Sequence, residues 1–151
     1  GLDRRPLSGT EGPMKLFLLI AAAIFAAGCS VPKLEAAECS ASRPALREFY
    51  SAHFGGDMLF SKERLEEKRR FLSERFYQSL TAATGDADPF TSGTADVPRA
   101  FRIGNCEKSA EGRTTFEVLL FWRDDARTEQ RAIRVELEQN GDSWLIDKVN
   151  N

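Results

Sequence analysis

The sequence has little of what several common chemistries require. It contains one histidine and three cysteines among 151 residues, too few and too scattered for a zinc site built from closely spaced Cys and His ligands. Its formal net charge is −2, whereas a nucleic-acid-binding domain carries a strongly basic surface. No phosphate-cradling glycine loop and no Ser–His–Asp signature is present. We therefore expect no metal, no cofactor and no nucleic-acid partner.

The chain also lacks an apolar run long enough to cross a membrane. A membrane-spanning helix needs about 20 apolar residues, and the run from Leu16 to Ala27 has 12. That length is typical of a signal-peptide core, and Lys15 supplies the positive charge that precedes such a core. Met14 is then the expected start, which makes residues 1–13 an upstream extension or a cloning remnant. The alternative is a longer basic leader.

The end of this run, "AAGC" at residues 26–29, resembles the bacterial lipobox, in which small residues precede a cysteine that is acylated and becomes N-terminal. The resemblance implies a lipoprotein signal peptide over 14–28 and lipidation of Cys29. Several acyl chains hold a protein stably on a bilayer. Because Ser30 rather than Asp follows, the expected location is the cell envelope, on the outer membrane facing the periplasm. Ordinary secretion and an uncleaved signal anchor are the alternatives.

Two cysteines remain once Cys29 is assigned to lipidation. Cys39 and Cys106, in an oxidising compartment, predict a disulfide. The bridge would close a loop of about 67 residues and stabilise the domain by about 4 kcal/mol on the loop-entropy model. Two unpaired thiols are the alternative.

Residues 29–40 show no periodicity and are predicted to be a tether, and residues 41–151 a single α+β domain. The first helix is expected to begin at Ser42, an N-cap residue, with Pro44 in its first turn, and to end at Gly55. One apolar stripe with helical spacing marks its buried face: Leu46, Phe49, Tyr50, His53 and Phe54.

A second, longer helix is predicted from Ser61 to Gly85, with Leu65, Leu72 and Leu80 on its buried side. Its charge run "KERLEEKRR" is interpreted as a solvated face with pairs three and four residues apart. The loop over residues 85–99 is long for a compact domain, and such loops are often functional. Within it Phe90 either fills the core, which we favour, or lines a pocket.

The last third of the chain reads as four strands. Period-two alternation places Ile133, Val135 and Leu137 on one face, and Asn140-Gly141 is a strong hairpin signal. Short turns between the strands predict an antiparallel meander. The four predicted strands are residues 100–108, 114–123, 129–139 and 143–150.

Two helices, a long loop and a meander that ends in "GDSWLIDKV" (residues 141–149) are similar to the nuclear transport factor 2-like superfamily. "REFYSAHF" (47–54) and "DPF" (88–90) also resemble a bacterial envelope group of unknown function within it. The resemblance implies an α+β fold with two N-terminal helices packed on a curved, cone-like, four-stranded antiparallel meander. This superfamily includes isomerases, dehydratases, small-ligand carriers and interaction domains, so the fold alone does not give the function.

His53 is the best candidate for acid–base chemistry near neutral pH, which would need a carboxylate partner and a pocket. Asp57 and Asp147 are the weak candidates for that partner, and a histidine hydrogen-bonded within the core is the simpler interpretation. A pocket in the cone would be lined by aromatic and titratable side chains: Tyr50, His53, Phe90, Trp122 and Trp144.

The outer face of the second strand is apolar in its middle, at Leu119 and Phe121, with Arg123 and Arg134 around it. A polar rim around a small apolar centre is typical of a protein interface, so this face predicts a homodimer or an envelope protein partner. We therefore expect a lipid-anchored, non-enzymatic interaction domain. The alternatives are a small apolar ligand in the cone cavity and, behind it, an isomerase- or dehydratase-type enzyme that uses His53.

Overall fold

The computed structural model describes residues 34–94 and 96–151. The predicted signal peptide over 14–28, the upstream residues 1–13, the lipidation site Cys29 and residues 30–33 of the predicted tether lie outside the described residues. Every described helix and strand belongs to one compact unit, Glu35–Asn151. None of the described helices is both long and apolar enough to span a membrane.

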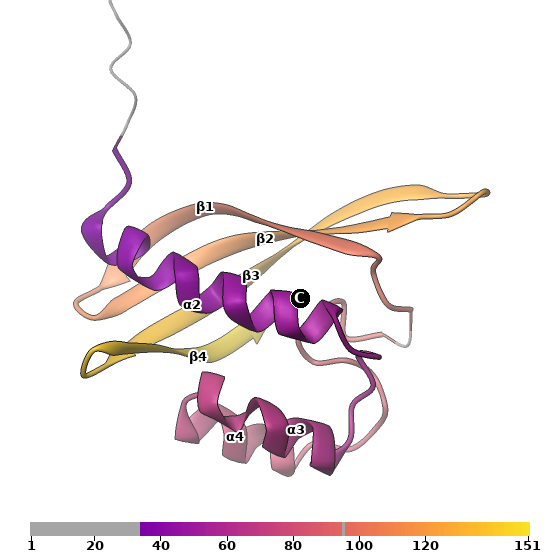
Figure 1. Ribbon diagram of the computed structural model, residues 1–151, viewed down its shortest axis with the longest axis horizontal. Helices are drawn as coiled ribbons and strands as arrows, with labels where there is room; N and C mark the ends of the chain where they lie inside the picture. The colour runs from indigo at the N-terminus through magenta and orange to yellow at the C-terminus, as the bar shows by residue number, and fades with distance from the viewer. Residues whose placement is uncertain (1–33, 95) are drawn as a thin grey trace, which may run out of the picture. The chain divides into compact units, whose positions relative to one another are not determined.

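The sheet is a four-stranded antiparallel meander in which the strands are neighbours in chain order (Figure 1). Its turns are tight, and Gly112 and Gly141 occupy two of them with φ of 63° and 61°, a conformation that glycine adopts at low cost. The predicted α+β class and meander are confirmed. The strands are β1 (Ala100–Ala110), β2 (Arg113–Arg123), β3 (Thr128–Asn140) and β4 (Ser143–Asn150).

The helix α2 (Ala37–Phe54) begins five residues before the predicted start. Ser42 is not its cap, because the Ser42 hydroxyl donates to the carbonyl of Glu38 at 2.7 Å and lies 3.1 Å from the hydroxyl of Thr114 on β2. Residues 37–40, which we had assigned to the tether, are therefore helical. Pro44 lies in the helix interior rather than in the first turn.

The predicted second helix is broken in two. The segment comprises α3 (Lys62–Lys68), the 3-10 turn η1 (Arg69–Phe71) and α4 (Glu74–Thr81). Leu72 is extended and pairs in parallel with Ile146 of β4, and the Ser73 N–H donates to the Ile146 carbonyl at 2.8 Å. The Ser73 hydroxyl then caps α4 by accepting from the Phe76 N–H. The edge of β4 thus interrupts the helix.

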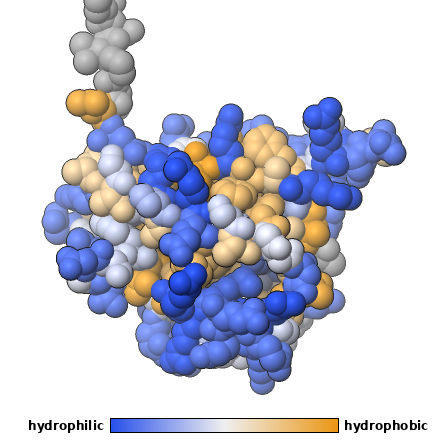
Figure 2. All heavy atoms as spheres, in the orientation of Figure 1, coloured by the Kyte–Doolittle hydropathy of each residue, from blue (hydrophilic) through white to orange (hydrophobic). Residues whose placement is uncertain are grey.

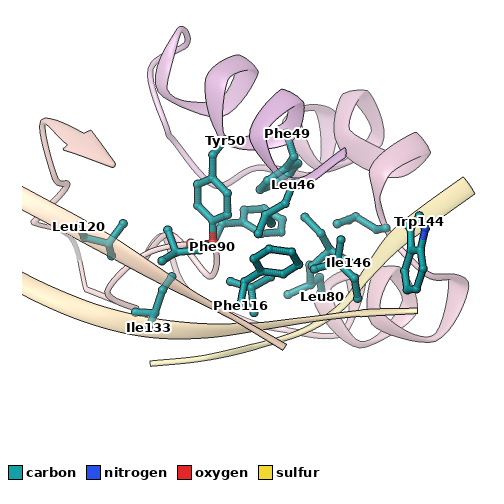
Figure 3. Packing of buried hydrophobic residues seen from close by; sticks show 14 of the residues in the cluster. Leu46, Phe49, Tyr50, Leu80, Phe90, Phe116, Leu120, Ile133, Trp144 and Ile146 are labelled. Carbon is teal, nitrogen blue, oxygen red and sulfur yellow. Dashed lines mark hydrogen bonds between the residues drawn. The ribbon is translucent and has the colours of Figure 1, made fainter. Parts of the chain in front are cut away.

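The core lies between α2 and one face of the sheet, with η1 and α4 beside β4 and α3 packed against η1 and α4 (Figure 1). Phe49, Tyr50 and Phe90 gather between α2 and the strands (Figure 3). The surface over α3 and α4 is hydrophilic, whereas apolar and neutral residues gather over α2 and β1 (Figure 2). The inner face of β2 contributes four core residues: Phe116, Val118, Leu120 and Trp122.

A disulfide between Cys39 and Cys106 joins α2 to β1, with 5.9 Å between the Cα atoms. The predicted pairing is confirmed. The same two elements are also connected where Arg43 donates to the carbonyl of Gly104 at 3.0 Å. This carbonyl lies at the irregularity in β1 between Ile103 and Cys106, so the Arg43 guanidinium covers part of an edge strand that would otherwise be open to pairing.

Candidate functional site

His53 forms a buried pair with Asp88, a residue of the long loop. The His53 Nε2 and Asp88 Oδ2 atoms lie 2.7 Å apart, and each side chain is 2% exposed. The carboxylate beside the histidine is therefore neither of the two that we had predicted. Asp57 instead pairs with Arg64 on the surface at 2.7 Å, and Asp147 lies in a separate network described below.

The loop is held to α2 by several bonds around this pair. Asp88 also accepts from the Phe90 N–H at 3.0 Å and from the Thr91 hydroxyl at 2.9 Å. The Tyr50 hydroxyl donates to the Phe90 carbonyl at 2.7 Å. Burial, and secondarily the charge of Asp88, raises the pKa of Tyr50 well above its usual value, so this hydroxyl stays protonated and remains a donor.

The surroundings of His53 leave no room for a substrate. A void of about 10 Å³ lies beside His53 and Asp88, which is about the space of one water molecule. The Nδ1 atom of His53 is buried and has no hydrogen-bond partner among the described residues. Phe49 stacks on the imidazole at 5.7 Å between ring centroids, and Phe90 approaches it edge-on at 5.3 Å. The pair therefore holds the loop and fills the core.

Asp147 is a buried carboxylate that ties β4 to two other elements. It accepts from the Ser73 hydroxyl at 2.6 Å and from Arg113 of β2 at 3.0 Å, and it pairs with Arg75 of α4. Burial opposes its ionisation, but the hydrogen bonds from Ser73, Arg75 and Arg113 outweigh that effect and hold the pKa of Asp147 below its usual value. This network stabilises the fold and opens into no cavity beside His53.

The five residues predicted to line one pocket do not surround a common cavity. Tyr50, His53 and Phe90 lie together in the filled core. Trp144 borders an open hollow of about 390 Å³, which is also lined by Pro44 and by residues of η1. Trp122 borders a different hollow, which is described below.

The predicted partner face carries less exposed apolar surface than its sequence suggested. Leu119 is 8% exposed although it lies outside the core cluster, and Arg102 is its cross-strand neighbour on β1. The Arg102 guanidinium lies 6.0 Å from the ring centroid of Phe121, which is half-buried. Arg123 is exposed, and Arg134 pairs with Glu107 at 3.1 Å. Large apolar side chains are exposed elsewhere in the described chain: Leu34, Leu59 and Val97.

An open groove of about 480 Å³ lies between the C-terminal end of α2 and the root of the β2–β3 hairpin. Its volume falls within the range of about 300–1,000 Å³ that is usual for ligand sites. We call it the distal groove. It is lined by residues of α2 and the following turn, of the long loop and of the end of β2: Phe54, Met58, Asp96, Val97, Pro98, Arg99, Trp122, Arg123 and Asp124.

The backbone of the distal groove carries local strain. Met58 has φ of 53°, the one positive value at a non-glycine residue in the described chain. Such conformations cost of order 1–3 kcal/mol and are frequent at binding sites. Our sequence analysis did not identify the groove, although the length of the loop that contributes Val97 and Pro98 was a signal for it.

The charged residues of the distal groove are unequally engaged. Asp96 pairs with Arg127 at 2.7 Å, and its carbonyl accepts from the Trp122 indole at 3.3 Å. Arg99 and Arg123 are both exposed and form no ion pair within residues 34–94 and 96–151. The groove is therefore lined by two acidic and two basic residues, of which Asp96 alone forms an ion pair among the described residues.

No protein-family model matches this sequence, and no curated protein matches it. A crystal structure of a protein of unknown function from Bacteroides thetaiotaomicron VPI-5482 is similar to the chain, with a TM-score of 0.54 and 18% sequence identity. The match covers 91% of this chain and 99% of that chain. At this level of identity the likeness concerns the fold alone.

Proposed function

We propose that the protein is a lipid-anchored, non-enzymatic interaction domain of the bacterial cell envelope, which docks a protein partner in the distal groove. One observation carries the proposal. The core around the single histidine is filled, whereas the groove is open and keeps Arg99 and Arg123 without ion pairs among the described residues. The open groove therefore offers a surface for binding, whereas the filled core leaves no space for a substrate next to His53.

The envelope location rests on two features of the chain. The 12-residue apolar run that ends in "AAGC" favours export and acylation of Cys29, which would moor the domain to the outer membrane on its periplasmic side. The Cys39–Cys106 bridge is typical of proteins in oxidising compartments. Each feature supports the same compartment independently of the other.

We also propose that the domain is a cone-like member of the nuclear transport factor 2-like superfamily. The order of its elements supports this, since a long helix and a broken helical segment precede a four-stranded meander. Register shifts in β1 after Ile103 and in β4 at Asp147 add local curvature of the kind that bends a sheet around a helix. The small apolar ligand that such a cone could hold has little room here, because Phe49, Tyr50 and Phe90 fill the space.

Site-specific photo-crosslinking in living cells tests the proposed function. A photoreactive phenylalanine at Val97 places the probe in the groove, at a side chain that is 37% exposed. The same probe at Ser79, an exposed residue of α4 outside the groove, is the control. We expect a discrete crosslinked protein from position 97 only. That product should disappear when Arg99 and Arg123 are both changed to Gln, and persist when the exposed Arg47 is changed to Gln.

Equal crosslinking from both positions, or none from position 97, would overturn the proposal. A crosslink to a second copy of this chain would replace the foreign partner with self-association, which mass spectrometry of the product distinguishes. A catalysed reaction that depends on His53 would also refute it.

A further inference from the structure

We propose that the protein partner adds an extended segment to the free edge of β1, next to the distal groove. This inference rests on the proposed function and names how the partner is held, namely by hydrogen bonds between the two main chains. It is carried by the direction of the main-chain groups at Phe101 and Ile103 and by the uneven protection of the β1 edge.

The hydrogen-bond pattern shows which main-chain groups of β1 point away from the sheet. The Arg99 N–H donates to the Phe121 carbonyl at 2.7 Å, so Phe121 directs its main-chain groups toward β1, as does every second residue of β2. Phe101 and Ile103 pair in register with the residues in between, so their own groups point away from β2. The Ile103 carbonyl agrees with this direction, because the nearest donor to it is the guanidinium of Arg43 on α2, at 3.5 Å.

Three main-chain groups on this side of β1 are free. β1 is the first strand in the sheet order, so its outer side has no neighbouring strand. The N–H and C=O of Phe101 and the N–H of Ile103 have no hydrogen-bond partner among residues 34–94 and 96–151. Such a row of groups is a template for pairing with another chain, and protein domains bind extended peptides in this way. The three groups can bond two alternate residues of an added strand.

The remainder of the β1 edge is protected against the same contact. A register shift follows Ile103, and the Arg43 guanidinium covers the Gly104 carbonyl at 3.0 Å. Lys108 places a further charge on the strand. Bulges and lysines are features by which proteins keep edge strands from pairing. The first part of β1, up to Ile103, keeps a regular register with β2 and contains no lysine, so the free edge is confined to it.

This free edge continues one wall of the distal groove. Val97, Pro98 and Arg99 line the groove and lead directly into β1. Phe54 of α2 also lines the groove, and its ring centroid lies 5.0 Å from that of Phe101. A partner segment that occupies the groove therefore reaches the free main-chain groups of β1 without crossing another element.

The side chains along the edge determine the pattern of the partner segment. Phe101 and Ile103 pack against the core, so residues that pair with them lie beside an apolar face, whereas Arg102 between them is exposed and lies on the other face. The segment should therefore alternate apolar with polar residues. Two copies of this chain paired antiparallel along the same stretch would set their Arg102 side chains directly opposite each other, which is destabilising. This arrangement favours a foreign partner.

The test starts from the crosslinked product of position 97, in which mass spectrometry identifies the partner segment. The segment is then synthesised in three forms: unmodified, and N-methylated at alternate residues in each of the two possible frames. Binding to the detergent-solubilised full chain is measured by fluorescence anisotropy. Methylation in the frame that faces β1 should weaken binding about tenfold or more, because it removes a donor and keeps the strands apart. Methylation in the other frame should change binding by less than about twofold, because those N–H groups point away from β1.

A matched pair of variants tests the same contact on the protein. Ile103→Pro removes an N–H that points away from β2, so the sheet keeps its own hydrogen bonds while the added strand loses one. The crosslink from position 97 should weaken in this variant and persist in Ile103→Val, which keeps the N–H. Circular dichroism and formation of the Cys39–Cys106 bridge check that the proline variant folds, and the methylated peptides decide the question if it does not.

Equal binding of the two methylated peptides would overturn the inference, because recognition would then not depend on the main chain. A folded Ile103→Pro variant that crosslinks as strongly as Ile103→Val would overturn it as well. In both cases the crosslink from position 97 to a foreign protein would still support the proposed function, so the two failures are distinguishable. A product that joins position 97 to this chain itself, or no product at all, would remove both.

Discussion

The Cys39–Cys106 bridge should supply a large share of the free energy of unfolding. The two residues are 67 positions apart, and the loop-entropy model assigns about 4 kcal/mol at 25 °C to the constraint that such a bridge imposes on the unfolded chain. Single domains have a net stability of about 5–15 kcal/mol. We therefore expect that reduction of the bridge, or replacement of both cysteines by Ala, removes between about a quarter and most of the net free energy of unfolding.

Equilibrium urea unfolding measures this effect directly. The oxidised protein, the protein reduced with dithiothreitol and the double Cys→Ala variant should be compared by circular dichroism. The reduced protein should lose about 4 kcal/mol. The variant should lose somewhat more, because Cys39 is fully buried and its truncation leaves a small cavity. The slope of stability against urea should rise without the bridge, since a less constrained unfolded chain exposes more surface.

The native state itself should change little when the bridge is opened. Other contacts still join the first helix to the sheet, including the Ser42–Thr114 hydroxyl pair at 3.1 Å and the bond from Arg43 to the Gly104 carbonyl at 3.0 Å. Near-UV spectra of the reduced and oxidised proteins should therefore match. A loss below about 1 kcal/mol, or a spectrum that collapses on reduction, would refute an effect located in the unfolded chain.

Three further predictions follow from the buried groups and the leader. Changing Asp147 to Asn should cost about 2–3 kcal/mol at pH 7 in urea unfolding. The pKa of Asp147 is lowered from 3.8 in the folded state. Its contribution to stability is therefore complete above that pH and is lost as the pH falls further. The free energy of unfolding of the variant should consequently depend less on pH in the acid range. Changing Phe90 to Ala should cost about 3–5 kcal/mol by calorimetry, and an unchanged melting temperature would contradict its place in the core. Changing Cys29 to Ala should abolish acyl labelling and release the protein from membranes, and labelling that survives would contradict the lipobox.

The sheet could be predicted because its signals are local. Alternation along residues 129–139 and the Asn140-Gly141 turn depend only on neighbouring positions, and the observed strands extend those predictions by two residues or fewer at each end. The Cys39–Cys106 pairing followed from arithmetic, since only two cysteines remained after the proposed lipid site.

The break in the second helix could not be predicted from its own residues. The helical spacing of apolar residues continues through Leu72, and the interruption arises because Ser73 bonds to Ile146, more than seventy residues later. The partner of His53 was missed for a similar reason. Several carboxylates were plausible, and only the fold of the loop brings Asp88 within 2.7 Å. The distal groove was missed for the same reason, because it forms only where the long loop meets the end of β2 in the folded chain.

The order of elements along the chain has a consequence for biosynthesis. All four strands lie after residue 99, so the apolar side of the first helix, at Leu46 and Phe49, lacks the sheet that it packs against until the final third of the chain has been made. Assembly then depends on contacts between distant positions, which makes folding comparatively slow.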